Sequence, residues 1–245
     1  MKMADAFDLI SDDFVADLND IRSVVRTFDS PTFMPKTRVA AANSATLLLA
    51  ATFEEFVREM AREYARAVVN GTGSFAQLPR KLAGTAWKRT MDGLGKIKFD
   101  EHASGVDLVN AANAKFSTIY EFCRGDLTKE IYMELIHNDS NMRPTQLNEL
   151  FNVSGLSDVC RRCSGEQVLL DHFGETEPNV THGKLITALQ DFFERRNGVA
   201  HSIAAMRSSG ASQILTEIDL LERFARALSA ILESNAPPVH VRLQP

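Results

Sequence analysis

The chain has 245 residues, of which 44% are hydrophobic, and this composition allows a sizeable core and excludes a disordered protein. The formal net charge of −5 excludes a general nucleic-acid-coating protein, because such proteins are usually basic. No apolar run approaches the roughly 20 residues of a membrane span, the N-terminus is too acidic for a signal peptide, and three cysteines do not make a disulfide framework, so we expect a cytoplasmic protein without membrane contact.

Helical periodicity runs along the whole chain, and no segment alternates as a strand does. Apolar residues spaced three or four apart predict an N-terminal helix up to residue 28, and Pro31 and Pro35 then interrupt the pattern. A second long helix is expected from about 37 to 69. Further helical patterns cover residues 79–92, 105–136 with an interruption at 124–126, 144–152, 156–163, 184–196, 198–207 and 212–234. We expect residues 171–182 to form a loop, and the fold to be all-α.

A basic stretch at residues 79–98 stands out in this acidic chain, because it contains one acid, Asp92. A tryptophan, Trp87, lies within it. One interpretation is a surface that binds a phosphate backbone and stacks a base on the indole ring. The other is a solvated helix face with Trp87 turned into the core. The side chains that the first interpretation assigns to phosphate binding are Lys88, Arg89, Lys96 and Lys98.

Two cysteines, Cys160 and Cys163, have the spacing of a metal or redox pair. A zinc site needs four ligands, the nearest candidates are His172 and His182, and there is no second cysteine pair. We therefore interpret the cysteines as two half-buried thiols on a short helix. Neither a metal nor another cofactor is expected.

The segment Arg195–His201 places arginine, asparagine and histidine close together after an apolar helix. Asn is a favoured N-cap and Gly commonly ends a helix, so Asn197-Gly198 predicts a break between two helices. His201 would then lie in the first turn of the second helix, where free N–H groups favour phosphate. Arg196 beside a histidine suits phosphodiester chemistry. The structural alternative is a cap in which Asn197 caps the helix, Arg196 pairs with a glutamate and His201 is packed. Arg195 is expected to be a salt-bridge donor, although a different helix register could exchange its role with that of Arg196.

These residues resemble the HEPN superfamily, which is all-α and is defined by an Arg, a polar residue, three more residues and a His. Its apolar flank Phe192-Phe193-Glu194-Arg195, the phrase Phe53-Glu54-Glu55-Phe56 and the phrase Asn141-Met142-Arg143-Pro144-Thr145 look most like the RiboL-PSP-HEPN branch. The resemblance covers about residues 36–234 and implies a HEPN-like domain there, with an insertion at about 75–180. The apolar spacing predicts an amphipathic helix in residues 1–30, and Pro237-Pro238 predicts an extended tail at 235–245.

The resemblance also implies a metal-independent endoribonuclease that acts as a homodimer, with RNA as its substrate. His201 would act as the general base or acid, Arg196 would stabilise the transition state and Asn197 would position the phosphate. Glu54 would orient His201 or Arg196; alternatively it is a surface glutamate, and whether Glu54 or Glu55 faces the site is open. The setting implied is stress response, toxin–antitoxin or phage defence, with an antitoxin or regulatory protein as a partner. The alternative function is a catalytically silent HEPN module for dimerisation and for binding a partner or nucleotide.

Overall fold

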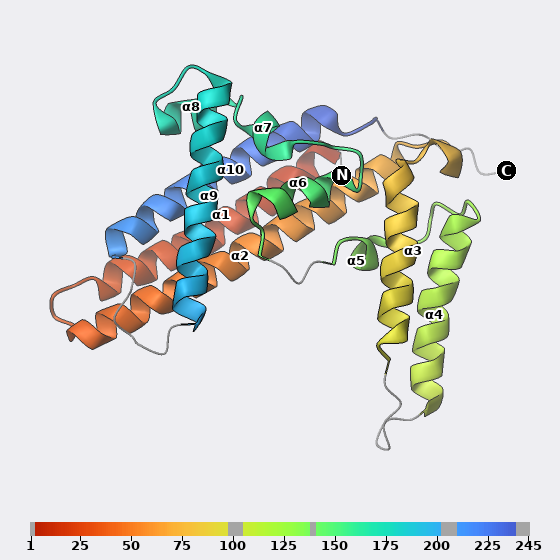
Figure 1. Ribbon diagram of the computed structural model, residues 1–245, viewed down its shortest axis with the longest axis horizontal. Coiled ribbons are helices and arrows are strands. Elements are labelled where there is room, and N and C mark those ends of the chain that lie inside the picture. The colour runs from red at the N-terminus through yellow and green to blue at the C-terminus, as the bar shows by residue number, and fades with distance from the viewer. Residues whose placement is uncertain (1–2, 98–104, 138–140, 202–209, 239–245) are drawn as a thin grey trace. The chain divides into compact units, whose positions relative to one another are not determined.

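The computed structural model describes residues 3–97, 105–137, 141–201 and 210–238, and in these ranges helices are the only regular elements (Figure 1). The all-α expectation is confirmed. Lys98 lies outside the described residues. Within the described ranges, none of the helices combines the length and the apolar character that crossing a membrane requires. The elements are α1 (Met3–Phe28), α2 (Pro35–Asn70), the 3-10 helix η1 (Phe75–Gln77), α3 (Arg80–Gly95), α4 (Gly105–Cys123), α5 (Tyr132–Leu135), α6 (Pro144–Asn152), α7 (Val159–Cys163), α8 (Gln167–Phe173), α9 (Pro178–His201) and α10 (Ala211–Asn235).

The chain divides into two compact units. The first comprises residues 1–60, 140–148 and 158–234, and the second comprises 61–139, 149–157 and 235–245. The units do not follow the boundaries expected from the sequence, since α1 and residues 158–180 both lie in the first unit. The division of this chain into an N-terminal helix at 1–30, a HEPN-like domain with an insertion at 36–234 and a tail at 235–245 stays a prediction.

The core of the first unit is built around one phenylalanine, Phe53 of α2. Its ring centroid lies 6.2 Å from that of Phe14 on α1, 6.1 Å from that of Phe193 on α9 and 5.9 Å from that of Phe224 on α10. All four side chains are buried, and aromatic pairs at such separations contribute about 0.5–1.5 kcal/mol each beyond the burial of their area. Because every partner ring comes from a different helix, this cluster fixes α9, which carries the Arg–Asn–His motif, against α2 (Figure 1).

In the second unit, α3 packs against α4 and α5. The contact uses one side of α3, where Leu82, Ala86 and Thr90 recur at helical spacing and are buried. After α4, Gly125 adopts a positive φ of 106°, a conformation that costs glycine little and most residues much. This confirms the interruption that the sequence predicts at residues 124–126.

The prediction of a loop at residues 171–182 is wrong. Helix α8 continues to Phe173, and α9 begins at Pro178. Proline suits the first turn of a helix, because its missing N–H would have no partner there and its φ is already helical. The connection is therefore short, and Gly174, with φ 64°, ends α8 in the left-handed conformation that often follows a helix.

Candidate active site

The motif lies on one uninterrupted helix. α9 runs from Pro178 to His201, so the predicted break at Asn197-Gly198 is wrong. A glycine inside a helix costs about 1 kcal/mol relative to alanine, but α9 is anchored by the buried Phe192 and Phe193. The Asn197 side chain is also used in tertiary contacts rather than as a cap. His201 therefore lies in the last turn of a helix and not in the first, and the argument from anion-binding N–H groups does not apply to it.

The continuity of α9 determines how the motif side chains are distributed. Asn197 and His201 are four residues apart and so lie one above the other on the same face. Arg196 points about 140° away from His201 around the axis, at 3.6 residues per turn. His201 is exposed, whereas Arg196 and Asn197 are half-buried. The motif thus presents an accessible imidazole beside an amide, with the arginine directed to the adjoining side.

A carboxylate on α2 lies near the arginine. Glu54 is only 9% exposed. Burial raises the pKa of its carboxyl, while the positive charges of Arg196 and Arg58 and a hydrogen bond from the Met142 backbone N–H act to lower it. Arg58 Nη2 lies 3.5 Å from Glu54 Oε2. The neighbouring Glu55 is exposed and bonds Arg58 at 2.8 Å, so Glu54 is the carboxylate that faces the motif.

The attraction between Glu54 and Arg196 acts through charge rather than through a direct hydrogen bond. Glu54 Oε1 and Arg196 Nε are both buried, and neither makes a hydrogen bond within the described part of the chain. Among the interactions of the described residues, none joins Glu54 to His201. Of the two partners expected for Glu54, Arg196 is the one whose charge acts on its carboxyl.

The amide of Asn197 is oriented by two donors. Asn141 Nδ2 donates to Asn197 Oδ1 at 2.8 Å, and Arg196 Nη1 donates to the same oxygen at 3.2 Å. Since both partners are donors, the accepting atom must be the oxygen, and the Asn197 NH₂ group is left to donate elsewhere. Asn141 and Met142 were not expected at the site, although the phrase that contains them carried part of the family resemblance.

The adjacent arginine has a different environment. Arg195 Nε donates to Glu217 Oε1 on α10 at 2.6 Å, and Arg195 Nη2 contacts the same oxygen. The Glu217 side chain is 4% exposed, and burial raises the pKa of its carboxyl against the attraction of Arg195 and a hydrogen bond from Gln213. The expectation that Arg195 is a salt-bridge donor is confirmed, and Arg196 is the arginine directed toward Asn197 and Glu54.

A family model described as RiboL-PSP-HEPN matches residues 10–234. The chain belongs to the RiboL-PSP-HEPN family. The match begins within α1 and ends within α10, so it includes every element that carries a site residue. Comparisons with curated proteins and with solved structures found no match.

In this RiboL-PSP-HEPN protein, the basic stretch of α3 is only partly available to a ligand. Lys88 and Lys96 are exposed, but Arg89 is half-buried, donates to the Leu135 backbone carbonyl, and has its pKa lowered by burial. Trp87 is 38% exposed and is not turned into the core. These residues belong to the second unit, whereas Arg196, Asn197, His201 and Glu54 belong to the first.

The cysteine pair is more buried than the sequence predicts. Cys160 and Cys163 are both fully buried rather than half-buried. Burial raises the pKa of the Cys160 thiol to about 12 and that of Cys163 well above its ordinary value. A thiol held protonated in this way is a poor metal ligand, because the thiolate is the form that binds. In the described ranges no group of three or more His, Cys, Asp or Glu side chains is placed to hold a metal ion.

The raised pKa of Glu54 predicts a pH-dependent stability. The folded carboxyl binds its proton more tightly than the unfolded one, so protonation in acid stabilises the fold and this contribution is lost as pH rises through the folded pKa. Glu54→Gln cannot titrate. Relative to this variant, the wild type should therefore lose free energy of unfolding between about pH 4 and about pH 7, by about 1.4 kcal/mol for each tenfold difference in proton affinity between the folded and the unfolded carboxyl. Urea unfolding at both pH values measures this difference.

The matched control for this experiment is Glu55→Gln, because Glu55 lies on the same helix with a side chain that is 50% exposed. It should change stability by about 0.5 kcal/mol or less. If the wild type instead gained stability over Glu54→Gln as pH rose, attraction by Arg196 and Arg58 would outweigh the burial of Glu54.

Proposed function

We propose that this protein is a metal-independent endoribonuclease that cleaves RNA by attack of a ribose 2′-hydroxyl on the adjacent phosphate. The observation that carries the proposal is the arrangement on α9: an exposed His201 one turn from the oriented amide of Asn197, beside an Arg196 attracted by the buried Glu54. Membership of the HEPN superfamily supports it, because many HEPN proteins are ribonucleases of this kind.

Each side chain has a role in this reaction. His201 takes the proton of the 2′-hydroxyl, or gives one to the leaving 5′-oxygen. The 2′-oxygen bonds to phosphorus as the bond from phosphorus to the 5′-oxygen breaks, which leaves a 2′,3′-cyclic phosphate and a 5′-hydroxyl. Arg196 stabilises the charge that grows on the phosphate oxygens. Because its attraction to Glu54 uses no direct hydrogen bond, Arg196 keeps donors for that phosphate.

The remaining two side chains position the others and the substrate. The Asn197 NH₂ group, whose direction is set by Asn141 and Arg196 on its oxygen, donates to the scissile phosphate. Glu54 is a positioning residue, because it acts on Arg196 by charge and is too buried to touch RNA.

We also propose a homodimer in which two copies of the motif form one site. A single His201 offers one imidazole, whereas the reaction needs a base on one side of the phosphate and an acid on the other, and a two-fold axis supplies the second. The exposure of His201 at the end of α9 is compatible with such an interface. Light scattering at micromolar concentration should give a mass of about twice 27.1 kDa. A monomer that cleaves RNA would contradict this assembly.

One observation argues against the structural alternative, in which the motif only caps a helix and packs. That alternative needs a break at Asn197 and a packed His201, but α9 is continuous and His201 is exposed. The silent HEPN module remains the outcome if the purified protein binds a partner or nucleotide and does not cut RNA. By family resemblance we place the protein among stress, toxin–antitoxin or phage-defence effectors, under the control of an antitoxin or regulatory protein.

The direct test of the proposed activity is incubation of the purified full chain with total RNA, with and without EDTA. Cleavage to the same extent in both conditions is expected, since none of the proposed roles uses a metal. Cleavage that EDTA abolishes would contradict the proposal, and intact RNA in both conditions would favour the silent module.

A further inference from the structure

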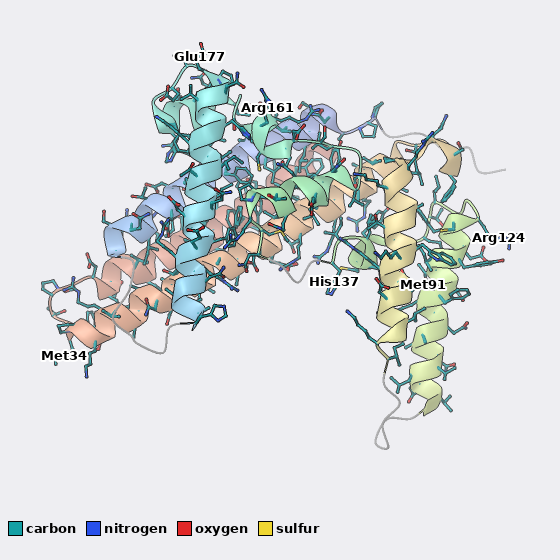
Figure 2. The ribbon with its side chains drawn as sticks, in the orientation of Figure 1. Met34, Met91, Arg124, His137, Arg161 and Glu177 are labelled. Carbon is teal, nitrogen blue, oxygen red and sulfur yellow. The ribbon has the colours of Figure 1, made fainter. Side chains whose placement is uncertain are left out.

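Three aromatic side chains of the second unit form an exposed group on helices α3 and α4. Trp87 is 38% exposed, Phe116 39% and Tyr120 42%. The rings of Trp87 and Phe116 meet edge to face with centroids 6.2 Å apart, and those of Phe116 and Tyr120 are stacked at 5.8 Å. The Arg124 guanidinium lies 5.7 Å from the Tyr120 ring centroid, and its side chain projects outward beside the C-terminal end of α4 (Figure 2). We call Trp87, Phe116, Tyr120 and Arg124 the aromatic face.

Packing within the second unit does not explain why these three rings are left exposed. The buried side of α4 carries Ile119 and Phe122, which are almost completely buried, whereas Phe116 meets Trp87 of α3 with both rings more than a third exposed. Phe116 and Tyr120 are four residues apart and so share one side of α4, with Arg124 one turn further on. Aromatic rings left half in water on a helix that already has a buried side indicate a surface for a ligand.

Positive charges predominate around the aromatic face, because the acid that follows Arg124 in the chain, Asp126, pairs with Lys129 at 3.4 Å. Lys88, next to Trp87, is exposed. The acids of α4, Asp107 and Glu121, lie about 100° or more from Tyr120 around the helix axis, and Asp92 of α3 lies about 140° from Trp87. Residues 80–96 contain five basic side chains and one acidic, for a net charge of +4 in a chain whose total is −5. Of the five, Lys96 lies about 180° from Trp87 around the axis of α3 and Arg89 is half-buried, so Lys88 is the basic side chain of α3 that lies beside Trp87 in the sequence and is exposed. The aromatic face is thus a cationic area of an acidic protein.

We propose that the aromatic face binds single-stranded RNA, with bases stacked on Trp87, Phe116 and Tyr120 and phosphates neutralised by Lys88 and Arg124. Every base offers a π-face to an aromatic side chain, so such a surface accepts RNA without sequence preference. The identity of the nucleic acid as RNA rests on the proposed function, but binding itself needs none of the motif residues.

A second copy of this chain is a poorer occupant of the aromatic face. In a two-fold interface the same patch meets itself, so Lys88 and Arg124 of one copy would be brought close to the same cationic patch of the other. Like charges brought together across an interface oppose association, whereas a polyanion is attracted. The net charge of the α3 stretch therefore favours RNA over self-association.

The experiment uses the wild-type chain and a fluorescein-labelled 2′-O-methyl oligoribonucleotide, which lacks the attacking hydroxyl and cannot be cleaved by the proposed reaction. Fluorescence anisotropy gives the Kd as a function of salt. Trp87→Ala and Tyr120→Ala should each raise Kd roughly 5- to 150-fold, the range for loss of one base-stacking ring. Tyr120→Phe keeps the ring and should bind as the wild type does.

A double variant removes two charges at exposed positions and keeps the three rings. Lys88→Gln together with Arg124→Gln should make the negative slope of log K against log salt shallower by about 1.4, because each phosphate contact on a single strand contributes about 0.7 to its magnitude. The control is Lys36→Gln, an exposed lysine of α2 in the first unit, which should leave the slope unchanged.

The proposal would be overturned if Kd were unchanged in Trp87→Ala and Tyr120→Ala and the salt slope were unchanged in the Lys88→Gln, Arg124→Gln double variant. It would also be overturned by a dimer that becomes a monomer in Trp87→Ala with RNA affinity retained, since the face would then be an interface between copies. Because the probe is not cut, this result is independent of catalysis: a protein that cleaves RNA but binds equally well without the aromatic face refutes only this inference. A protein that loses binding with the face but cleaves nothing refutes only the proposed activity.

Discussion

Replacement of His201 or Arg196 by alanine is expected to lower the rate of RNA cleavage by about 10² or more in each case, the size of effect seen when an acid–base group or a donor to a developing charge is removed. The stabilities of the two variants should differ. His201 is exposed, so its removal costs little packing. Arg196→Ala leaves the buried carboxyl of Glu54 with Arg58 as its remaining charged neighbour and should cost on the order of 1–3 kcal/mol.

Single-turnover cleavage rates and urea unfolding of the same preparations measure both effects. Arg196→Lys is the informative companion, because lysine keeps the charge beside Glu54 but loses the forked donors that fit a phosphate. It should restore stability more fully than cleavage. Full cleavage by His201→Ala would contradict the assignment of the motif as the reactive centre.

Arg195→Ala is expected to do the opposite of Arg196→Ala, although the two residues are neighbours. It removes the charged partner of Glu217, whose side chain is 4% exposed and keeps the hydrogen bond from Gln213. Breaking a buried ion pair from one side leaves an uncompensated charge and costs about 3–5 kcal/mol, a large part of the total stability of an ordinary domain, which is about 5–15 kcal/mol. The cleavage rate per folded molecule should stay near that of the wild type.

A double variant makes this prediction specific. Arg195→Met combined with Glu217→Leu removes both charges and keeps the volume apolar, so it should recover most of the stability lost in Arg195→Ala. The comparison distinguishes the two arginines whose roles the sequence leaves interchangeable. If Arg195→Ala abolished cleavage while Arg196→Ala only reduced stability, the roles would have to be exchanged.

Much of the helical architecture is predictable from periodicity, because the buried side of a long helix repeats along the sequence. α2 and α10 lie within a few residues of their expected ranges, and the turn at Gly125 is visible as a glycine next to polar residues. The helix break at Asn197-Gly198 follows from local preference and is wrong. Local preference amounts to about 1 kcal/mol, and tertiary contacts such as that between Asn141 and Asn197 outweigh it.

The site is predictable only where its members are close in sequence or belong to the family pattern. Arg196, Asn197 and His201 are found from their spacing, and Glu54 from the resemblance. Asn141 is 56 residues from its partner Asn197, and no local signal joins them. Nor does the sequence show where α9 packs on α2, so it leaves open whether Glu54, which flanks the apolar side of α2, or Glu55, about 100° further around the helix, turns toward the motif.

The availability of the basic residues is a further property that composition does not show. Arg89 and Lys88 are adjacent and equally charged in the sequence. One is half-buried and donates to the Leu135 carbonyl, and the other is exposed. The packing of α5 against α3 buries part of Arg89, which has a structural contact, and leaves Lys88 accessible to a ligand.

The most direct test of the central claim is the chemical analysis of the RNA ends produced in EDTA. Attack by the 2′-hydroxyl with His201 as its proton acceptor or donor predicts fragments that end in a 2′,3′-cyclic phosphate and begin with a 5′-hydroxyl, and predicts that these fragments disappear with His201→Ala. Fragments with a 3′-hydroxyl and a 5′-phosphate, or cyclic-phosphate fragments formed equally well by His201→Ala, would contradict it.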